Sequence, residues 1–162
     1  MAVAKKATAR NTSTKKASAK KTTTKKTTST SGTTEMSVSG NKKIDTLRKE
    51  FNKKFPYLKL YLCFSYARKN VASGGSIAQI PGDRTLASVR REDTSGTISI
   101  SPNKKVKSLE QEFDKVFGLY CQVGMTKQNG QGYYTGGSLD EKTLAGLNTW
   151  CEENGYKKGV WK

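Results

Sequence analysis

NKKIDTLRKEFNKKF, at residues 41–55, is the stretch that decides the fold, and it returns 62 residues later as NKKVKSLEQEFDKVF at residues 103–117. Each copy carries four apolar residues at spacings of 3, 4 and 4, which place their side chains on one stripe of an α-helix. The chain is therefore predicted to contain a duplicated unit, with each copy built on one amphipathic helix. The two stripes are Ile44, Leu47, Phe51 and Phe55, and Val106, Leu109, Phe113 and Phe117.

Sequence signals mark both ends of these helices. Asn41 and Asn103 stand at the starts, where an Asn side chain can accept a hydrogen bond from a free helical N–H group. Pro56 follows the first copy and Gly118 follows the second, and both residue types end helices. We therefore expect two helices that are capped by the asparagines and stop before Pro56 and Gly118.

Strand candidates flank each helix. Residues 58–64, LKLYLCF, alternate as a strand with one buried face does, and residues 119–125 occupy the same place after the second helix. Short strand candidates precede the helices at residues 36–39 and 97–101. The order strand, helix, strand is thus expected twice.

A turn-rich segment and a short helix complete each copy. In the first segment Gly74-Gly75 lacks the Gly-Lys-Ser/Thr of a phosphate loop, so a hairpin between residues 58–64 and 76–80 is the simpler prediction. Asn129-Gly130 is a strong hairpin signal in the second segment. We also expect a short helix that uses Leu86 and Val89 in the first copy. Its counterpart in the second uses Leu144, Leu147 and Trp150, with Asp140 as its N-cap and Gly155 after its last residue. A last edge strand is expected over 156–162 and contains Trp161.

The predicted fold class is α+β, with the helices packed on an antiparallel or mixed sheet. A disordered basic tail at residues 1–34 precedes two βαββα repeats at residues 35–96 and 97–162, which form two domains or one joint domain. Counting the strand at 97–101 with the first repeat gives a ferredoxin-like order. The turn around Asp83-Arg84-Thr85-Leu86 resembles the β-grasp pattern, so the topology stays open between these arrangements.

Positive charge is concentrated in the tail. The chain has a formal net charge of +17, and residues 1–34 hold 8 Lys, 1 Arg and no acidic residue, which contribute +9 of it. The segment has no periodic apolar face to offset the entropy of folding, so we expect it to be disordered in isolation. Its cations are Lys5, Lys6, Arg10, Lys15, Lys16, Lys20, Lys21, Lys25 and Lys26.

In composition, this Lys-, Ala- and Thr-rich tail resembles the histone H1-like tails of nucleoid proteins. The resemblance implies nucleic-acid binding through neutralisation of phosphate charge by these nine cations, without readout of the bases. It covers about a fifth of the chain, and no family is identified for the remaining residues. A solubilising tail, or an electrostatic handle for any acidic surface, is the alternative interpretation.

Lysines of the first helix extend this candidate nucleic-acid-binding surface. Lys42, Lys49 and Lys53 are expected opposite the apolar stripe, close to one another at 100° per residue. A charged row on a helix is also what an ordinary solvated face looks like. The proximity of the basic tail in the sequence favours a role in binding.

Catalytic and metal-binding chemistry is not expected. The chain has no histidine, which removes the commonest general base and metal ligand, and no pattern matches a cofactor fingerprint. Cys63, Cys121 and Cys151 lack metal-ligand spacing and are expected to be buried reduced thiols. We predict no enzyme, no cofactor and no metal. No transmembrane run or secretory signal is seen, so a cytoplasmic location is expected, with the nucleoid if the source is bacterial.

Two functions compete on these grounds. The first is a non-enzymatic nucleic-acid-binding protein, with DNA as the favoured partner, whose tail contacts phosphates. The second is a protein-interaction or assembly module whose tail tethers it to an acidic surface, and a phage or mobile-element component would fit either. DNA against RNA, sequence preference and oligomeric state do not follow from the sequence.

Overall fold

The computed structural model describes residues 35–72, 78–91 and 95–159. The predicted tail at residues 1–34 and the end of the predicted last strand, including Trp161, lie outside these residues. The described residues form an α+β structure with antiparallel sheets, as predicted.

The two long helices are where the apolar stripes predicted them: α1 spans Ile44–Lys54 and α4 spans Val106–Phe117. All eight stripe residues are buried and belong to one hydrophobic cluster, which draws on both halves of the chain. Gly118 ends α4 in the left-handed conformation, with φ of 62°, and its N–H donates to the carbonyls of Asp114 and Phe113. The predicted helices and their stops are thereby confirmed.

The predicted asparagine caps are wrong. The N-cap residues are Lys43 and Lys105, and neither helix has a side-chain cap. The first N–H groups of the helices are satisfied by the backbone instead. Ile44 N donates to the carbonyl of Arg84 at 2.9 Å, and Val106 N donates to that of Lys142 at 3.1 Å. Backbone carbonyls of segments distant in sequence therefore accept the hydrogen bonds from the helix N-termini that the asparagine side chains were expected to accept.

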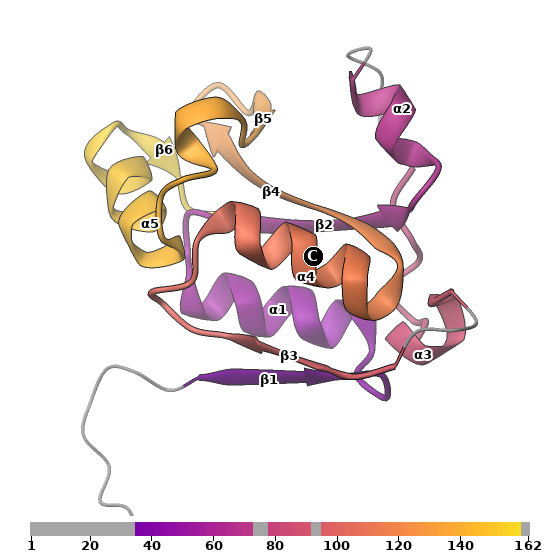
Figure 1. Ribbon diagram of the computed structural model, residues 1–162. Coiled ribbons are helices and arrows are strands. Elements are labelled where there is room, and N and C mark those ends of the chain that lie inside the picture. Colours follow the sequence, from indigo (N-terminus) through magenta and orange to yellow (C-terminus); the bar gives the residue numbers. More distant parts are fainter. Residues whose placement is uncertain (1–34, 73–77, 92–94, 160–162) are drawn as a thin grey trace, which may run out of the picture. The chain divides into compact units, whose positions relative to one another are not determined.

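The strands form two sheets rather than the single sheet expected. Among the described residues, β1 (Met36–Ser39) and β3 (Thr97–Ile100) form a two-stranded sheet. β2 (Lys59–Phe64) pairs with β4 (Leu119–Lys127) in a separate antiparallel sheet. Figure 1 shows α1 and α4 lying between these two sheets. The helices thus cover one face of each sheet, and their residues 44–54 and 106–117 supply the middle layer.

The larger sheet is completed by β5 (Gly132–Tyr134) and β6 (Tyr156–Lys157). β5 follows β4 through the turn at Asn129-Gly130, where Gly130 has φ of 87°, so the predicted hairpin is confirmed. β6 pairs with residues 126–127 of β4, on the same edge of β4 where β2 pairs with residues 119–124. Within the described residues, the predicted last strand is thereby reduced to two residues.

The hairpin predicted between residues 58–64 and 76–80 is not found in the described part of the chain. Residues Ala67–Ala72 form a short helix, α2, and residues 78–80 are not in a strand. A single backbone hydrogen bond, from Ile80 N to the Leu62 carbonyl at 2.9 Å, holds this segment to the sheet. α2 lies in the connection between the two predicted strands, where the run Ala67-Arg68-Lys69 consists of good helix formers.

The short helices α3 (Leu86–Val89) and α5 (Leu144–Glu153) lie at the predicted places. Their N-caps are Thr85 and Thr143, whose side chains accept from the N–H groups of Ser88 and Gly146. Asp140 is therefore not the cap of α5. It follows a short 3₁₀ helix, η1 (Gly137–Leu139). None of the helices in the described residues is long and apolar enough to span a membrane.

Candidate nucleic-acid interface

The predicted site residues divide into two groups. The nine cations of the tail lie outside the described residues, and the three helix lysines lie within them. Lys42 precedes α1 and forms an ion pair with Glu50 at 2.5 Å, with only 20% of its side chain exposed. Lys49 and Lys53 are exposed on α1. The surface is therefore mixed in charge, because Glu50, the partner of Lys42, lines a cavity together with Lys53.

This cavity has a volume of about 550 Å³. It is lined by Glu35, Met36, Glu50, Lys53 and Lys54, so acidic and basic groups share it. Such a surface attracts phosphate less than a purely basic one, because the carboxylates offset the lysines. Phosphate binding by Lys42, Lys49 and Lys53 remains a prediction, and the neighbouring carboxylates make these lysines weaker candidates than the cations of the tail.

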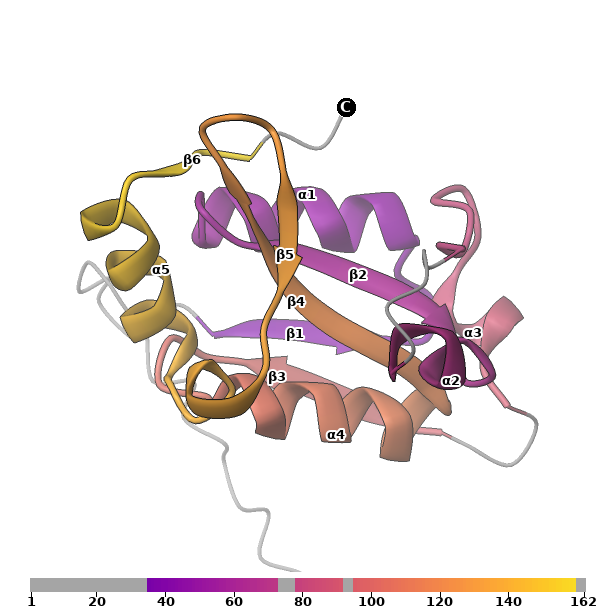
Figure 2. The same ribbon diagram turned by 90° about the horizontal axis from the view of Figure 1, so that it is seen from above.

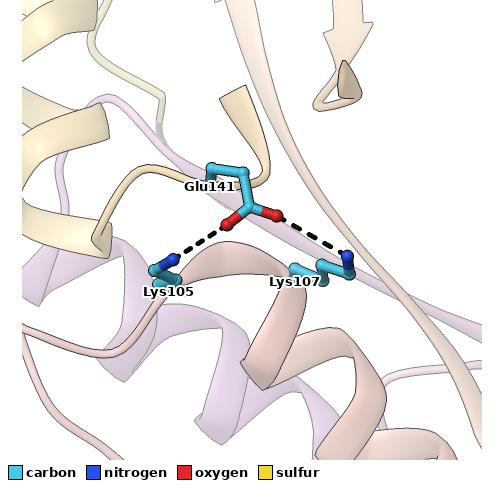
Figure 3. Close-up of polar contacts among 3 residues, drawn as sticks. All are labelled: Lys105, Lys107 and Glu141. Atoms are coloured by element: carbon cyan, nitrogen blue, oxygen red, sulfur yellow. Dashed lines mark hydrogen bonds and ion pairs between the residues drawn. The ribbon is translucent and has the colours of Figure 1, made fainter. Parts of the chain in front are cut away.

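Ion pairing also occupies the lysines around the start of α4. Lys104 pairs with Glu112, at the positions that Lys42 and Glu50 hold in the first half. Lys105 and Lys107 both point toward Glu141, at 2.8 and 3.5 Å (Figure 3). The hydrogen bond from Lys105 and the charges of both lysines lower the pKa of Glu141, which keeps it ionised. These cations are already partnered by carboxylates of the same protein.

The outer face of the larger sheet carries tyrosines in place of ion-paired lysines. Its residues lie in three rows across the strands. The first row holds Lys59, Gly124 and Tyr134, the second holds Tyr61 and Gln122, and the third holds Cys63 and Tyr120. Figure 2 looks onto this face, where α2 is the helix of the described chain that lies over the strands. We call the following five residues the tyrosine face: Lys59, Tyr61, Tyr120, Gln122 and Tyr134.

Aromatic packing organises the middle of the tyrosine face. The rings of Tyr61 and Tyr134 meet edge to face, with centroids 5.1 Å apart and planes at 84°. Gly124 makes room for this, because a Cβ atom there would lie 2.7 Å from Cε2 of Tyr61. The ring of Tyr61 therefore leans across the row in which Gly124 lies, toward Tyr134.

α2 covers one end of this face. Ala67 packs with Cys63 and the ring of Tyr120 in a small hydrophobic cluster. Arg68 places its guanidinium 5.6 Å from the centre of the Tyr120 ring and pairs with Asp114 of α4 at 3.1 Å. The connection between the two predicted hairpin strands thus supplies a cation to the rim of the sheet.

A partly buried carboxyl lies beside the sheet. Glu110 of α4 accepts hydrogen bonds at Oε1 from Val123 N, at 3.0 Å, and from Thr135 Oγ1, at 3.3 Å. Burial raises the pKa of this carboxyl to about 7, and the charge of Asp140 adds to the effect. The group also lines a cavity of about 380 Å³ together with Arg68 and other residues of α4 and β4.

Arg48 holds the corresponding place in the first half. It is 62 residues before Glu110, has 4% of its surface exposed, and donates to the carbonyl of Ile80 at 3.1 Å. Asp45 lies 3.5 Å from its guanidinium. Each long helix therefore uses one ionisable side chain, buried Arg48 or partly buried Glu110, to hold a segment that follows in the chain, through Ile80 or Thr135. Sequence reasoning missed this role in both cases.

The cysteines are free and buried, as predicted. Burial raises the pKa of the Cys63 and Cys151 thiols to about 11 and that of Cys121 well above its usual value. The thiols are therefore protonated at neutral pH. In the described residues no group of three His, Cys, Asp or Glu side chains could hold a metal ion.

Comparison of the chain with protein-family models, with curated proteins and with solved structures finds no match.

Proposed function

We propose that this protein binds nucleic acid, with DNA as the favoured partner, and that it catalyses no reaction. The observation that carries the proposal is the charge of residues 1–34, which is +9 without a single acidic residue. A polycation binds phosphates by releasing their counterions and reads no bases. The protein would act in the cytoplasm, on the nucleoid if the source is bacterial.

The distribution of ion pairs supports this assignment of the tail. Several lysines of the folded part are paired with carboxylates, as Lys42 is with Glu50 and Lys105 with Glu141. The tail contains no carboxylate that could compete with phosphate. Its cations are therefore the primary phosphate contacts in this proposal, and Lys49 and Lys53 are secondary ones.

We expect binding to duplex DNA to weaken steeply with salt. If about six tail cations contact phosphates at once, log K should fall with log salt with a slope of about −5, since each neutralised phosphate contributes about −0.9. Replacing Lys15, Lys16, Lys20, Lys21, Lys25 and Lys26 with Gln should flatten the slope sharply and weaken all sequences alike. Fluorescence anisotropy at several salt concentrations measures both effects.

The matched control is the triple change of Lys42, Lys49 and Lys53 to Gln. It should reduce the slope less, because Lys42 already has a partner and a rigid face reaches fewer phosphates. A tail variant that keeps the full slope while the helix variant loses it would move the binding surface to α1. Tight binding that is insensitive to salt would remove the electrostatic mechanism altogether.

A role in binding a protein partner is the second candidate. It is favoured by the sheet of β1 and β3, which has two strands in the described chain, so each strand has one edge without a strand neighbour there. Such edges can accept a strand from another protein. Salt-independent capture of a partner by a chain that lacks affinity for DNA and RNA would favour this function over the first.

We further propose that the two halves are copies of one βα-based unit related by an approximate twofold axis. The strand register supports this, since a residue of the first half pairs with the residue at the equivalent position of the second half. Ser37 pairs with Ser99 in this way, and Tyr61 pairs with Gln122. Equivalent backbone bonds recur as well: Ala87 N donates to the Gly40 carbonyl, and Ala145 N donates to that of Pro102.

NMR can test the twofold relation. We expect backbone NOEs that link Ser37 with Ser99 and Tyr61 with Gln122, as directly opposed residues of antiparallel strands give. NOEs that place either pair of strands one or more residues out of this register would remove the twofold relation.

A further inference from the structure

The tyrosine face combines stacking surfaces with a favourable charge. β2 and β4 contain one lysine each, and β2, β4 and β5 contain no Asp or Glu, whereas α1 and α4 carry several carboxylates. Lys59 lies at one end of the face. Arg68 lies over Tyr120 at the other, where it pairs with Asp114 of α4 and still has 58% of its side chain exposed. A polyanion therefore meets less repulsion from the strands than from the helices.

The aromatic rings on this face are accessible. Tyr134 is 39% exposed, and Tyr61 is partly exposed beside it. In their edge-to-face arrangement, the ring that contributes its edge keeps both of its faces clear of the other ring. Burial raises the pKa of both phenols, so they stay neutral at physiological pH and add no negative charge. Neutral rings in this position suit stacking by a flat, uncharged group on a polyanionic chain.

We propose that the tyrosine face binds single-stranded nucleic acid, with bases stacked on Tyr134 and Tyr61 and the backbone passing Lys59 and Arg68. This inference rests on the proposed nucleic-acid-binding function and names its substrate class. In a duplex the faces of the bases are already stacked, whereas a single strand can turn them onto a protein ring. The tail would supply affinity for any strand, and the sheet would supply the preference for single strands.

Tyr134→Ala, Tyr61→Ala and Tyr134→Phe test the proposal in the full chain. The probes are a fluorescein-labelled oligothymidylate and a labelled duplex of the same length, followed by anisotropy at one salt concentration. Loss of one stacking ring should weaken oligothymidylate binding by about 5- to 150-fold and leave duplex binding within about twofold. Tyr134→Phe keeps the ring and should bind like the original chain.

Tyr134 is the decisive position, because its exposure makes its removal compatible with folding even if Tyr61→Ala destabilises the sheet. A thermal melt of each variant checks the fold. Equal loss of single-strand and duplex binding by folded Tyr134→Ala, or no loss of either, would overturn the stacking proposal while salt-dependent binding by the tail persisted. Absence of binding to both probes by the unchanged chain would instead overturn the proposed function itself.

Discussion

Phe51→Ala and Phe113→Ala should each lower the free energy of unfolding by about 3–5 kcal/mol, the usual range for removing a buried Phe. Both side chains are fully buried, and each ring packs against the next Phe of its helix, Phe55 at 5.1 Å and Phe117 at 5.9 Å between centroids. A cavity at either place opens in the layer that lies between the two sheets. Because small domains are stable by only about 5–15 kcal/mol, either change could unfold much of the protein. Urea denaturation followed by circular dichroism measures the loss.

The controls lie two residues further along the same helices. Lys53→Ala and Lys115→Ala alter exposed side chains and should change stability by about 0.5 kcal/mol or less. If either lysine variant proved less stable than the phenylalanine variant of its helix, the buried faces of α1 and α4 would be assigned backwards.

The helices could be predicted because their signal is local. The spacing of Ile44, Leu47 and Phe51 is decided by the 3.6-residue turn, whatever the helix packs against. Their caps could not, because the N–H groups of Ile44 and Val106 are taken by carbonyls about 40 residues further along the chain. Alternation in the strands likewise predicts which side chains are buried, but it says nothing of which strand lies beside which. The division into two sheets is therefore a tertiary result.

The tyrosine face was visible in part in the sequence. In LKLYLCF and in the stretch after the second helix, the positions out of phase with the buried residues hold Lys59, Tyr61, Tyr120 and Gln122. An outward face with tyrosines in place of purely charged residues was the signal, and Gly124 within the strand marked a close approach. Tyr134 reaches the face through the predicted hairpin, whereas the place of Arg68 over Tyr120 depends on α2, which was not predicted.

The roles of Arg48 and Glu110 were missed for a physical reason. Ionisable side chains are rarely withdrawn from water, so buried Arg48 and partly buried Glu110 look like ordinary surface residues between apolar positions of an amphipathic helix. Their partners, the Ile80 carbonyl and the Val123 N–H, come from segments that local patterns cannot place. The recurrence of a charged residue at the same helix position in both copies was the available signal.

Glu110 should make the protein less stable as the pH rises from about 5 to 8. Burial lifts the pKa of this carboxyl from 4.5 to about 7 in the folded state, so the folded protein holds the proton more tightly than the unfolded chain. The resulting stabilisation is complete below pH 4.5 and is lost as the pH rises through about 7. At about 1.4 kcal/mol for each pH unit, the loss is at most about 3 kcal/mol.

Glu110→Gln should remove this dependence, because the amide oxygen can still accept from Val123 N while the side chain no longer titrates. We expect the variant to match the original chain near pH 5 and to exceed its stability by up to about 3 kcal/mol at pH 8. Glu112→Gln, on the same helix but with 38% of its side chain exposed, should leave the decline in place, since Glu110 is unchanged. Urea denaturation across this range measures all three proteins.

Because the chain has no histidine, no imidazole contributes to the change of stability between pH 5 and 8. The chain has no imidazole, the side chain that ordinarily titrates here, and burial keeps the three thiols protonated throughout. A decline of stability in this window therefore points to a carboxyl whose pKa burial has raised, and Glu110 is the described carboxyl with that property. Parallel stability curves for the original chain and Glu110→Gln between pH 5 and 8 would show that Glu110 is ionised in the folded protein throughout. The two hydrogen bonds from Val123 and Thr135 would then outweigh the cost of burying its charge.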